Sequence, residues 1–442
     1  MRGAIEIAAD VRGGRVRALQ IVEEALAALV RDDLVAVTRV LADRARAEAA
    51  AVDATVAAGG DPGPLAGVPY GVKDLFDVAG LPTHAGSTLY AGAPPASGDA
   101  EAIRRLRAAG AVLVATLNMD EFAYGFATIN ATYGTTRNPH DPSRLAGGSS
   151  GGSAAIVAVG VLPFSLGSDT NGSIRVPASL TGVYGLKPAH GSLPMAGVFP
   201  FADSFDDIGP FARSAAALKL VCEVLGGAAI DGSGLRIAIL GGRFRENADP
   251  DALAAMAEIA PDAPVIELPD IARARSAAFV ITASEGGTFH RAALARDAMA
   301  FDPATRDRLL AGALIPRGLY DEAQAFRAAF KARIAAMLAD YDVLLAPATP
   351  TTAPEIADPR IVIDGALSPA RADLGIHTQP ISFLGLPALS VPLRRPGRLP
   401  LGLQLIGRPG GEGALFAFAR AIEEKGVVGF SPPPGVYQGE MV

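Results

Sequence analysis

The chain of 442 residues contains one cysteine, no tryptophan, and five lysines against 34 arginines. Because Cys222 is alone, an intramolecular disulfide and a zinc site built from several cysteines are excluded. No run of about 18 uncharged apolar residues occurs, so a membrane-spanning helix is not expected. The first 20 residues mix charged with apolar side chains, unlike an export signal. These absences predict a cytoplasmic protein with no membrane partner.

The composition also excludes several classes of protein. The formal net charge is -7, whereas a general nucleic-acid-binding surface is usually basic. Half of the residues are apolar and only 19% are charged, which excludes a disordered chain. A chain well beyond roughly 250 residues can bury about three quarters of its unfolded surface, so one large core is feasible.

The order of apolar patterns predicts an α/β fold. An amphipathic helix at 99–110 ends in glycine and is followed by the buried strand pattern AVLVATLN. This alternation of helix and strand is typical of layered α/β proteins. No repeat, charged tail or long linker interrupts the chain, so we expect a single domain over 1–442. Its parts are N-terminal helices (1–60), a core (61–230), a variable helical region (240–340), and C-terminal strands with a closing helix (341–442).

A Gly/Ser-rich segment at 147–152 contains Ser149 and is the first candidate for chemistry. Such a composition is typical of a flexible surface loop. A phosphate cradle is disfavoured because no Gly-Lys-Ser/Thr follows. The segment also satisfies Gly-x-Ser-x-Gly, the motif of serine-hydrolase elbows, but that motif requires a preceding strand. The residues before it, NPHDPSRLA, predict a poor strand, so this segment alone indicates little.

The second candidate is the turn that follows the strand-like VLPFSLGSD and ends at Ser173. A strand ending in a turn of small residues can direct several backbone N–H groups at one point, as an oxyanion hole requires. Ser173 would lie beside those donors. An ordinary strand-to-loop turn that caps a helix is the alternative.

The third candidate is Lys73, which stands within an apolar strand pattern. A buried charged lysine is unfavourable unless it is paired. Burial lowers the pKa of a lysine and makes the neutral amine a usable base. A buried ion pair of Lys73 with Asp74 or Asp77 is the alternative.

Taken together in this order and spacing, Lys73, the segment GGSSGGS and the segment DTNGSIR resemble the amidase signature family of serine hydrolases. The resemblance runs from residue 63 to residue 197, extends to QPISFLGLPALSVPL and LGLQLIG, and is weakest at 240–340. It implies the amidase signature fold, a large mixed twisted β-sheet covered by helices on both faces. It also implies hydrolysis of a linear amide C–N bond with no cofactor and no metal.

The resemblance also implies a role for each matching residue. Ser173 would be the nucleophile that forms an acyl-enzyme, Ser149 the bridging serine on a cis peptide bond, and Lys73 the general base. The oxyanion would be bound by backbone N–H groups of Thr170, Asn171, Gly172 and Ser173. No histidine is needed, and we expect all five (84, 140, 190, 290 and 377) to have packing or surface roles.

Many family members have glycine where this chain has Asn171. Asparagine is the residue that best tolerates left-handed backbone geometry after glycine, so we expect the turn to persist. The Asn171 amide is also a candidate for reaching the substrate.

Within the family, several stretches are similar to the 1-carboxybiuret hydrolases of cyanuric acid breakdown: NMDEFAYGF, TRNPHDPSRLAGGSSGGS, SDTNGSIRVPAS and FPFADSFDDIGPFARS. This similarity implies loss of ammonia from a small carboxylate-bearing substrate, converting 1-carboxybiuret to urea-1,3-dicarboxylate. It further implies a small helical accessory subunit, so a homo- or hetero-oligomer is compatible with it.

The main alternative is the glutamine-hydrolysing component of a tRNA amidotransferase, the only interpretation that would bring a nucleic acid near. Those proteins usually carry Gln where this chain has Val176, and Arg where it has Ser192. A scaffold protein without catalysis is disfavoured by the intact Lys73, Ser149 and Ser173. A membrane fatty-amide hydrolase is disfavoured because no membrane segment precedes the signature region.

A carboxylate-bearing substrate requires a cationic or amide clamp. Arg175, next to the nucleophile, either binds that carboxylate or holds Asp169 in place. Tyr124, Asn171, His377 and Gln379 are further candidates for the pocket. We expect Phe122 and Phe126 to pack in the core rather than to line the pocket.

Overall fold

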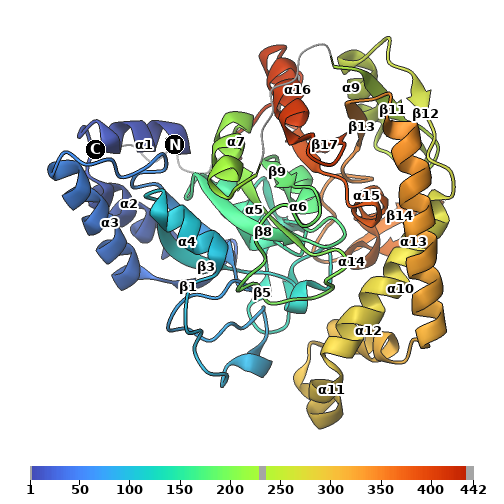
Figure 1. The fold of residues 1–442 in the computed structure, drawn as a ribbon, viewed down its shortest axis with the longest axis horizontal. Helices are drawn as coiled ribbons and strands as arrows, with labels where there is room; N and C mark the ends of the chain where they lie inside the picture. The colour runs from blue at the N-terminus through green and yellow to red at the C-terminus, as the bar shows by residue number, and fades with distance from the viewer. Residues whose placement is uncertain (1, 228–234, 435–442) are drawn as a thin grey trace.

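The computed structural model describes residues 2–227 and 235–434, and its centre is an eleven-stranded mixed sheet (Figure 1). The strand order is β1-β3-β2-β8-β10-β9-β16-β17-β13-β11-β12. The bounds of these strands are β1 Val37–Val40, β2 Pro69–Lys73, β3 Val112–Leu117, β8 Phe164–Asp169, β9 Tyr184–Lys187, β10 Asp207–Ala212, β11 Ile237–Leu240, β12 Val265–Ile266, β13 Val343–Pro347, β16 Ala388–Pro392 and β17 Gly402–Gly407.

Among the described residues, three two-stranded sheets lie outside the central one. They pair β4 (Ile129–Asn130) with β5 (Gly134–Thr135), β6 (Arg137–Asn138) with β7 (Asp141–Leu145), and β14 (Arg360–Ile363) with β15 (Ala366–Pro369).

Helices cover both faces of the central sheet, and α10 to α13 gather on the side of the molecule away from α1 to α3 (Figure 1). Their bounds are α1 Ala4–Arg12, α2 Ala18–Leu29, α3 Ala42–Ala57, α4 Glu101–Ala108, α5 Gly151–Ala158, α6 Arg175–Thr181, α7 Ala215–Val224, α8 Arg243–Glu246, α9 Pro250–Ile259, α10 Ile271–Phe289, α11 Arg291–Asp297, α12 Pro303–Ala313, α13 Arg317–Leu338, α14 Ala370–Asp373, α15 Gln379–Leu384 and α16 Glu412–Glu424. None of these described helices is both long and apolar enough to cross a membrane.

The middle of the sheet brings two of the candidate segments to one edge. β2 is buried along its whole length and pairs in parallel with both β3 and β8. In the β2–β8 pairing, Tyr70 stands opposite Phe164 and Val72 opposite Leu166. Parallel strands end at the same edge of a sheet. Lys73, the last residue of β2, therefore lies near the turn that leaves β8.

Local patterns predicted most elements of this core correctly. The helix expected at 99–110 is α4, the strand after it is β3, and VLPFSLGSD contains β8. Two strands differ from the prediction. β1 interrupts the helical region 1–60, and β7 forms within the segment predicted to be a poor strand. The backbone of β7 pairs with β6, and Leu145 donates to the carbonyl of Pro354, so tertiary partners override a weak local preference.

We predict that Leu186→Ala in β9 lowers the free energy of unfolding by about 3 kcal/mol, because a fully buried leucine leaves a cavity when truncated. Urea denaturation followed by circular dichroism measures this. The control is Leu367→Ala in β15, where the side chain is 61% exposed and the loss should stay within about 0.5 kcal/mol. Equal losses in the two variants would contradict the burial of the central sheet.

Candidate active site

Lys73 is fully buried at the end of β2 and contacts two serines. Its Nζ donates to Ser149 Oγ at 2.6 Å and to Ser168 Oγ at 2.8 Å. The alternative of an ion pair with Asp74 or Asp77 is wrong. The carboxylate of Asp74 accepts hydrogen bonds from Thr38 and Gly86, and that of Asp77 accepts one from Thr83. Lys73 instead faces the Gly/Ser-rich segment.

Burial in this site changes the protonation of the Lys73 amine. Desolvation lowers the pKa of Lys73 to about 7, and the negative charges of Asp120, Asp169 and Asp206 oppose this shift in part. A group with this pKa is about half neutral at pH 7, whereas an exposed lysine is almost wholly charged. The neutral fraction makes the amine capable of accepting a proton.

The segment at 147–153 is buried throughout, so its interpretation as a flexible surface loop is wrong. The peptide bond between Gly148 and Ser149 is cis. A Cβ at position 148 would lie 2.3 Å from Asp120 Oδ2 and 2.5 Å from the backbone nitrogen of Ala127, so only glycine fits there. Ser150 donates its N–H to the carbonyl of Ser173 at 3.3 Å, which joins this segment to the turn after β8.

Ser168 is a residue of the site that the sequence did not predict. It lies one residue before the end of β8 and accepts a hydrogen bond from Lys73. The segment contains several serines, and nothing in the sequence distinguishes Ser168 from the others. Only the parallel pairing of β2 with β8 brings it to the lysine.

The turn from Thr170 to Ser173 connects β8 to α6. Within the described parts of the chain, the four N–H groups of this turn donate to no protein acceptor. Gly172 has a φ of 139°, and a Cβ there would lie 2.0 Å from Thr378 Oγ1. Asn171 does not need its tolerance of left-handed geometry here, because the positive φ belongs to Gly172. The hydroxyl of Thr378 donates to the Asn171 carbonyl at 2.8 Å and keeps the turn in this shape.

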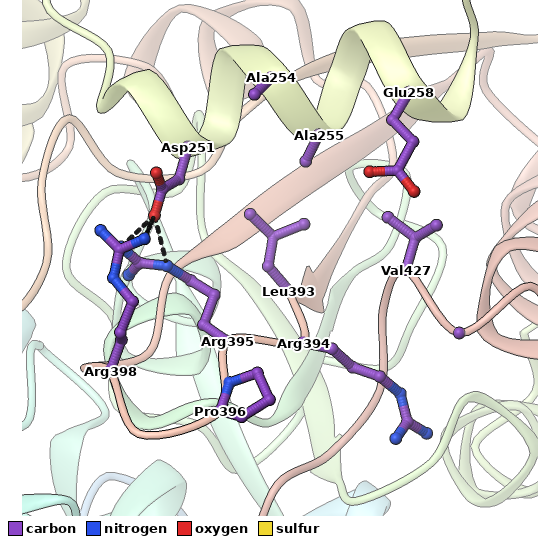
Figure 2. Close-up of a pocket in the computed structure, with 11 residues that line it drawn as sticks. Asp251, Ala254, Ala255, Glu258, Leu393, Arg394, Arg395, Pro396, Arg398 and Val427 are labelled. Atoms are coloured by element: carbon purple, nitrogen blue, oxygen red, sulfur yellow. Dashed lines mark hydrogen bonds and ion pairs between the residues drawn. The ribbon is translucent and has the colours of Figure 1, made fainter.

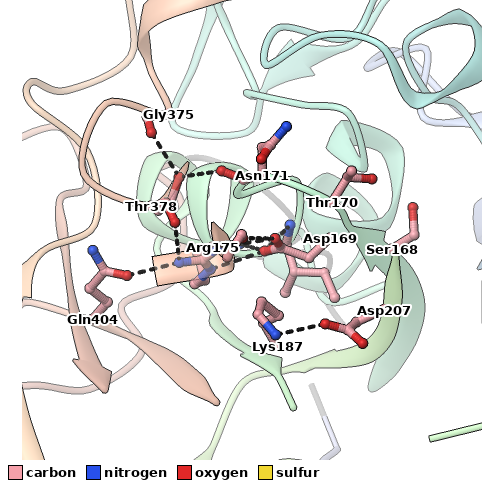
Figure 3. A network of polar contacts seen from close by, with 12 residues as sticks. Ser168, Asp169, Thr170, Asn171, Arg175, Lys187, Asp207, Gly375, Thr378 and Gln404 are labelled. Atoms are coloured by element: carbon pink, nitrogen blue, oxygen red, sulfur yellow. Dashed lines mark hydrogen bonds and ion pairs between the residues drawn. The ribbon is translucent and has the colours of Figure 1, made fainter. Parts of the chain in front are cut away.

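Arg175 forms a fully buried ion pair with Asp169, 3.0 Å apart, below this turn (Figure 3). Burial alone would raise the pKa of the Asp169 carboxyl, but Arg175 beside it holds the pKa below its ordinary value. A guanidinium has five N–H donors. Those of Arg175 are all engaged, by Asp169 twice and by Thr378, Ser382 and Gln404.

Of the two interpretations of Arg175, the structure therefore supports the one in which it holds Asp169. Because every donor already has a protein acceptor, none is left to bind the carboxylate of a substrate. The prediction that Arg175 binds the substrate carboxylate is therefore wrong.

A narrow cavity adjoins the turn, and the volume within it that water could occupy is about 20 Å³. It is lined by Ala123, Tyr124, Gly125, Phe126, Thr170, Asn171, Ser173, Phe201, Phe279, Arg308 and Gln379. The structure thus brings together five of the predicted site residues: Ser173, Thr170, Asn171, Tyr124 and Gln379. Phe126 packs in a buried apolar cluster, as expected, and one side of it also lines the cavity. Phe122 packs as predicted, against Tyr90, Phe199, His290 and Phe301.

The prediction that His377 belongs to the substrate pocket is wrong, because His377 does not line the cavity. Its ring is fully buried, with its centroid 6.0 Å from that of Phe244. Burial lowers the pKa of His377 to about 3, so the ring is neutral. A neutral ring packed in this way does not attract a substrate carboxylate.

Arg308, in α12, was not predicted but lines the cavity. It belongs to the region 240–340, where the sequence contains no recognisable motif. In the part of the chain that is described, no group of three or more His, Cys, Asp or Glu side chains is arranged to hold a metal ion.

The amino-acid sequence matches known proteins over nearly its whole length. The family described as Amidase matches residues 20–233 and 227–416. The chain is 45% identical to AtzE, a 1-carboxybiuret hydrolase component of Pseudomonas sp. (strain ADP), covering 96% of this chain and 98% of that protein. It is 34% identical to a component of the Glutamyl-tRNA(Gln) amidotransferase of Chloroflexus aurantiacus, covering 94% of each.

Solved structures are similar over the same extent. One, from work on a vestigial protein complex and the evolutionary origins of an s-triazine catabolic enzyme, has a TM-score of 0.94 and 44% identity, covering 97% of this chain and 100% of that one. A crystal structure of an amidase has a TM-score of 0.89 and 34% identity, covering 96% of this chain and 100% of its own. On these grounds the chain belongs to the amidase signature family, and it is a hydrolase that acts on amide carbon–nitrogen bonds.

Proposed function

We propose that the protein releases ammonia from a small linear amide through a triad of Ser173, Ser149 and Lys73. The observation that carries this proposal is the buried Lys73 amine, which has a pKa near 7 and is hydrogen-bonded to Ser149. Ser173 lines the neighbouring cavity, and its backbone carbonyl is bonded to the segment that contains Ser149. A neutral base, a bridging hydroxyl and a serine in a pocket are the parts of an activated nucleophile.

In the proposed acylation, Ser173 Oγ forms a bond to the amide carbonyl carbon. The Ser173 proton passes to Ser149 while Ser149 gives its own proton to Lys73. The unpaired N–H groups of 170–173 bind the negative oxygen that develops. When the C–N bond breaks, the protonated Lys73 returns the proton through Ser149 to the departing nitrogen, and ammonia leaves. Water then hydrolyses the acyl-enzyme by the same proton path.

We propose 1-carboxybiuret as the substrate, which would be converted to urea-1,3-dicarboxylate and ammonia. The name of the 45% identical relative supports this. The side-chain amide atoms of Gln379 and the Oδ1 of Asn171 are buried without a protein partner. An acylurea carries the N–H and C=O groups that such atoms would pair with.

Glutamine, the substrate implied by the alternative function, is less well supported. Its α-ammonium group would need an acidic partner, and the described lining of the cavity contains no Asp or Glu. Val176, at the position where the glutamine-hydrolysing proteins usually carry Gln, is fully buried in α6 and does not line the cavity.

A small helical accessory subunit is also proposed. Its support is that one structural neighbour comes from work on a protein complex. Co-purification of the untagged chain with the products of adjacent genes would test it, and a chain that is fully active alone would argue against an obligatory partner.

We predict that Ser173→Ala lowers ammonia release by at least about 1,000-fold, because the bond-forming oxygen is lost. The assay would use freshly generated 1-carboxybiuret beside biuret, malonamide and glutamine. Ser192→Ala is the matched control, since Ser192 is exposed and outside the cavity lining. Release near the wild-type rate by Ser173→Ala would refute the nucleophile, whereas release chiefly from glutamine would keep the triad and change the substrate.

The rate of acylation is predicted to rise about tenfold from pH 6 to pH 8, with a midpoint near 7, because only the neutral Lys73 accepts a proton. The sign follows from the lowered pKa: protonation below 7 removes the base, and deprotonation above 7 supplies it. Single-turnover measurements isolate the chemical step. A flat profile from pH 6 to pH 9 would argue against Lys73 as the base.

A further inference from the structure

We propose that Arg308 is the counter-ion for a carboxylate on the substrate, and that it makes the cavity selective for anionic over neutral short amides. This inference rests on the proposed amide hydrolysis at Ser173 and specifies how its substrate is recognised. Among the lining residues that the structure describes, Arg308 is the one with a charged side chain.

The surroundings of Arg308 leave its charge without a direct partner. The guanidinium carbon lies 3.7 Å from the centroid of the Tyr124 ring, and Nη1 donates to the Tyr124 carbonyl at 3.0 Å. Across the described residues, no carboxylate comes within 4.0 Å of the Arg308 nitrogens. Burial lowers the pKa of Arg308 and the Arg371 charge adds to this shift, whereas Tyr124 and the charge of Asp120 oppose it.

The remaining donors of Arg308 suit a carboxylate. Nε and Nη2 have no acceptor among the described groups, and together they form one side of the planar guanidinium fork. Such a fork binds the two oxygens of a carboxylate with two parallel hydrogen bonds. A ligand carboxylate would therefore supply both the missing acceptors and the missing negative charge.

Two arginines of another cavity, and an arginine close to Arg308, are instead paired with carboxylates of the protein. In the cavity of Figure 2, Arg395 and Arg398 converge on the same carboxylate oxygen of Asp251. Arg371, near Arg308, lies 3.8 Å from Asp120 and 3.7 Å from Asp302. These charges are already neutralised within the protein, whereas that of Arg308 is not.

The polar atoms along the rest of the cavity extend this recognition to the body of the substrate. Gln379 is fully buried with both amide atoms unpartnered, and Asn171 Oδ1 is unpartnered as well. A buried amide without a partner is unfavourable, and a ligand with its own N–H and C=O groups would remove this cost. The polar groups of the lining therefore match those of a short amide or acylurea that ends in a carboxylate.

The test compares malonamate with malonamide, which have the same length but differ by one negative charge. Binding is measured by calorimetry in the Ser173→Ala background, so that no turnover intervenes. We expect malonamate to bind at least tenfold more tightly than malonamide. Adding Arg308→Met should reduce this preference at least tenfold, and Arg308→Lys should reduce it by less, since it keeps the charge but loses the fork.

Arg306→Met is the matched control in the same helix, because Arg306 is paired with Asp307 at 2.8 Å and does not line the cavity. The preference for malonamate should be unchanged in this variant. Circular dichroism checks that each variant is folded. If Arg308→Met does not fold, the Ser173→Ala protein and the Arg308→Lys variant still decide the question.

A second readout is the ratio of kcat/KM for 1-carboxybiuret to that for biuret, which should fall about 100-fold in Arg308→Met. An absence of Ser173-dependent hydrolysis in the wild-type protein would remove the proposed function, but the binding comparison would still test Arg308. Equal binding of malonamate and malonamide, binding of neither, or an undiminished preference in Arg308→Met would overturn the inference.

Discussion

The buried ion pair between Arg175 and Asp169 is the constraint on which the shape of the site depends. Asp169 ends β8 and Arg175 begins α6, so the pair closes the turn between them. The other donors of Arg175 reach Thr378, Ser382 and Gln404, which ties this turn to α15 and β17 (Figure 3). Removing one partner of such a pair leaves an uncompensated buried charge, at about 3–5 kcal/mol. Interactions outside the turn therefore fix the positions of its unpaired N–H groups.

Burial determines the chemistry of two cations in opposite ways. Lys73 has no charged partner within bonding distance and responds by losing its proton near pH 7, because a lysine can become neutral. Arg308 also lacks a carboxylate partner but remains protonated, since a guanidinium is effectively always charged. The first is suited to act as a base and the second to attract an anion. The catalytic roles of Lys73, Ser149 and Ser173 remain predictions.

Most candidate site residues of the core (61–230) could be predicted from the sequence, whereas those of the helical region 240–340 could not. The core residues Lys73, Ser149 and Ser173 stand in recognisable motifs, and their surroundings follow from strands β2 and β8, which local patterns predicted correctly. Arg308 stands in α12 among many other arginines and carries no motif. Ser168 was missed for the same reason. The division of the chain into parts, with a single domain over 1–442, also stays a prediction.

The sequence by itself determined the family, the α/β class, and which serines and lysine to examine, because buried strands and signature motifs are local features. Tertiary structure alone decided which candidates share a cavity. In the folded protein every donor of Arg175 has an acceptor. His377 lies outside the cavity lining, whereas Phe126 and Arg308 belong to it. Tertiary structure also assigned the positive φ to Gly172 rather than Asn171. The physical reason is that hydrogen-bond partners and charge compensation come from segments far apart in the sequence, such as those of Arg175 and Gln404.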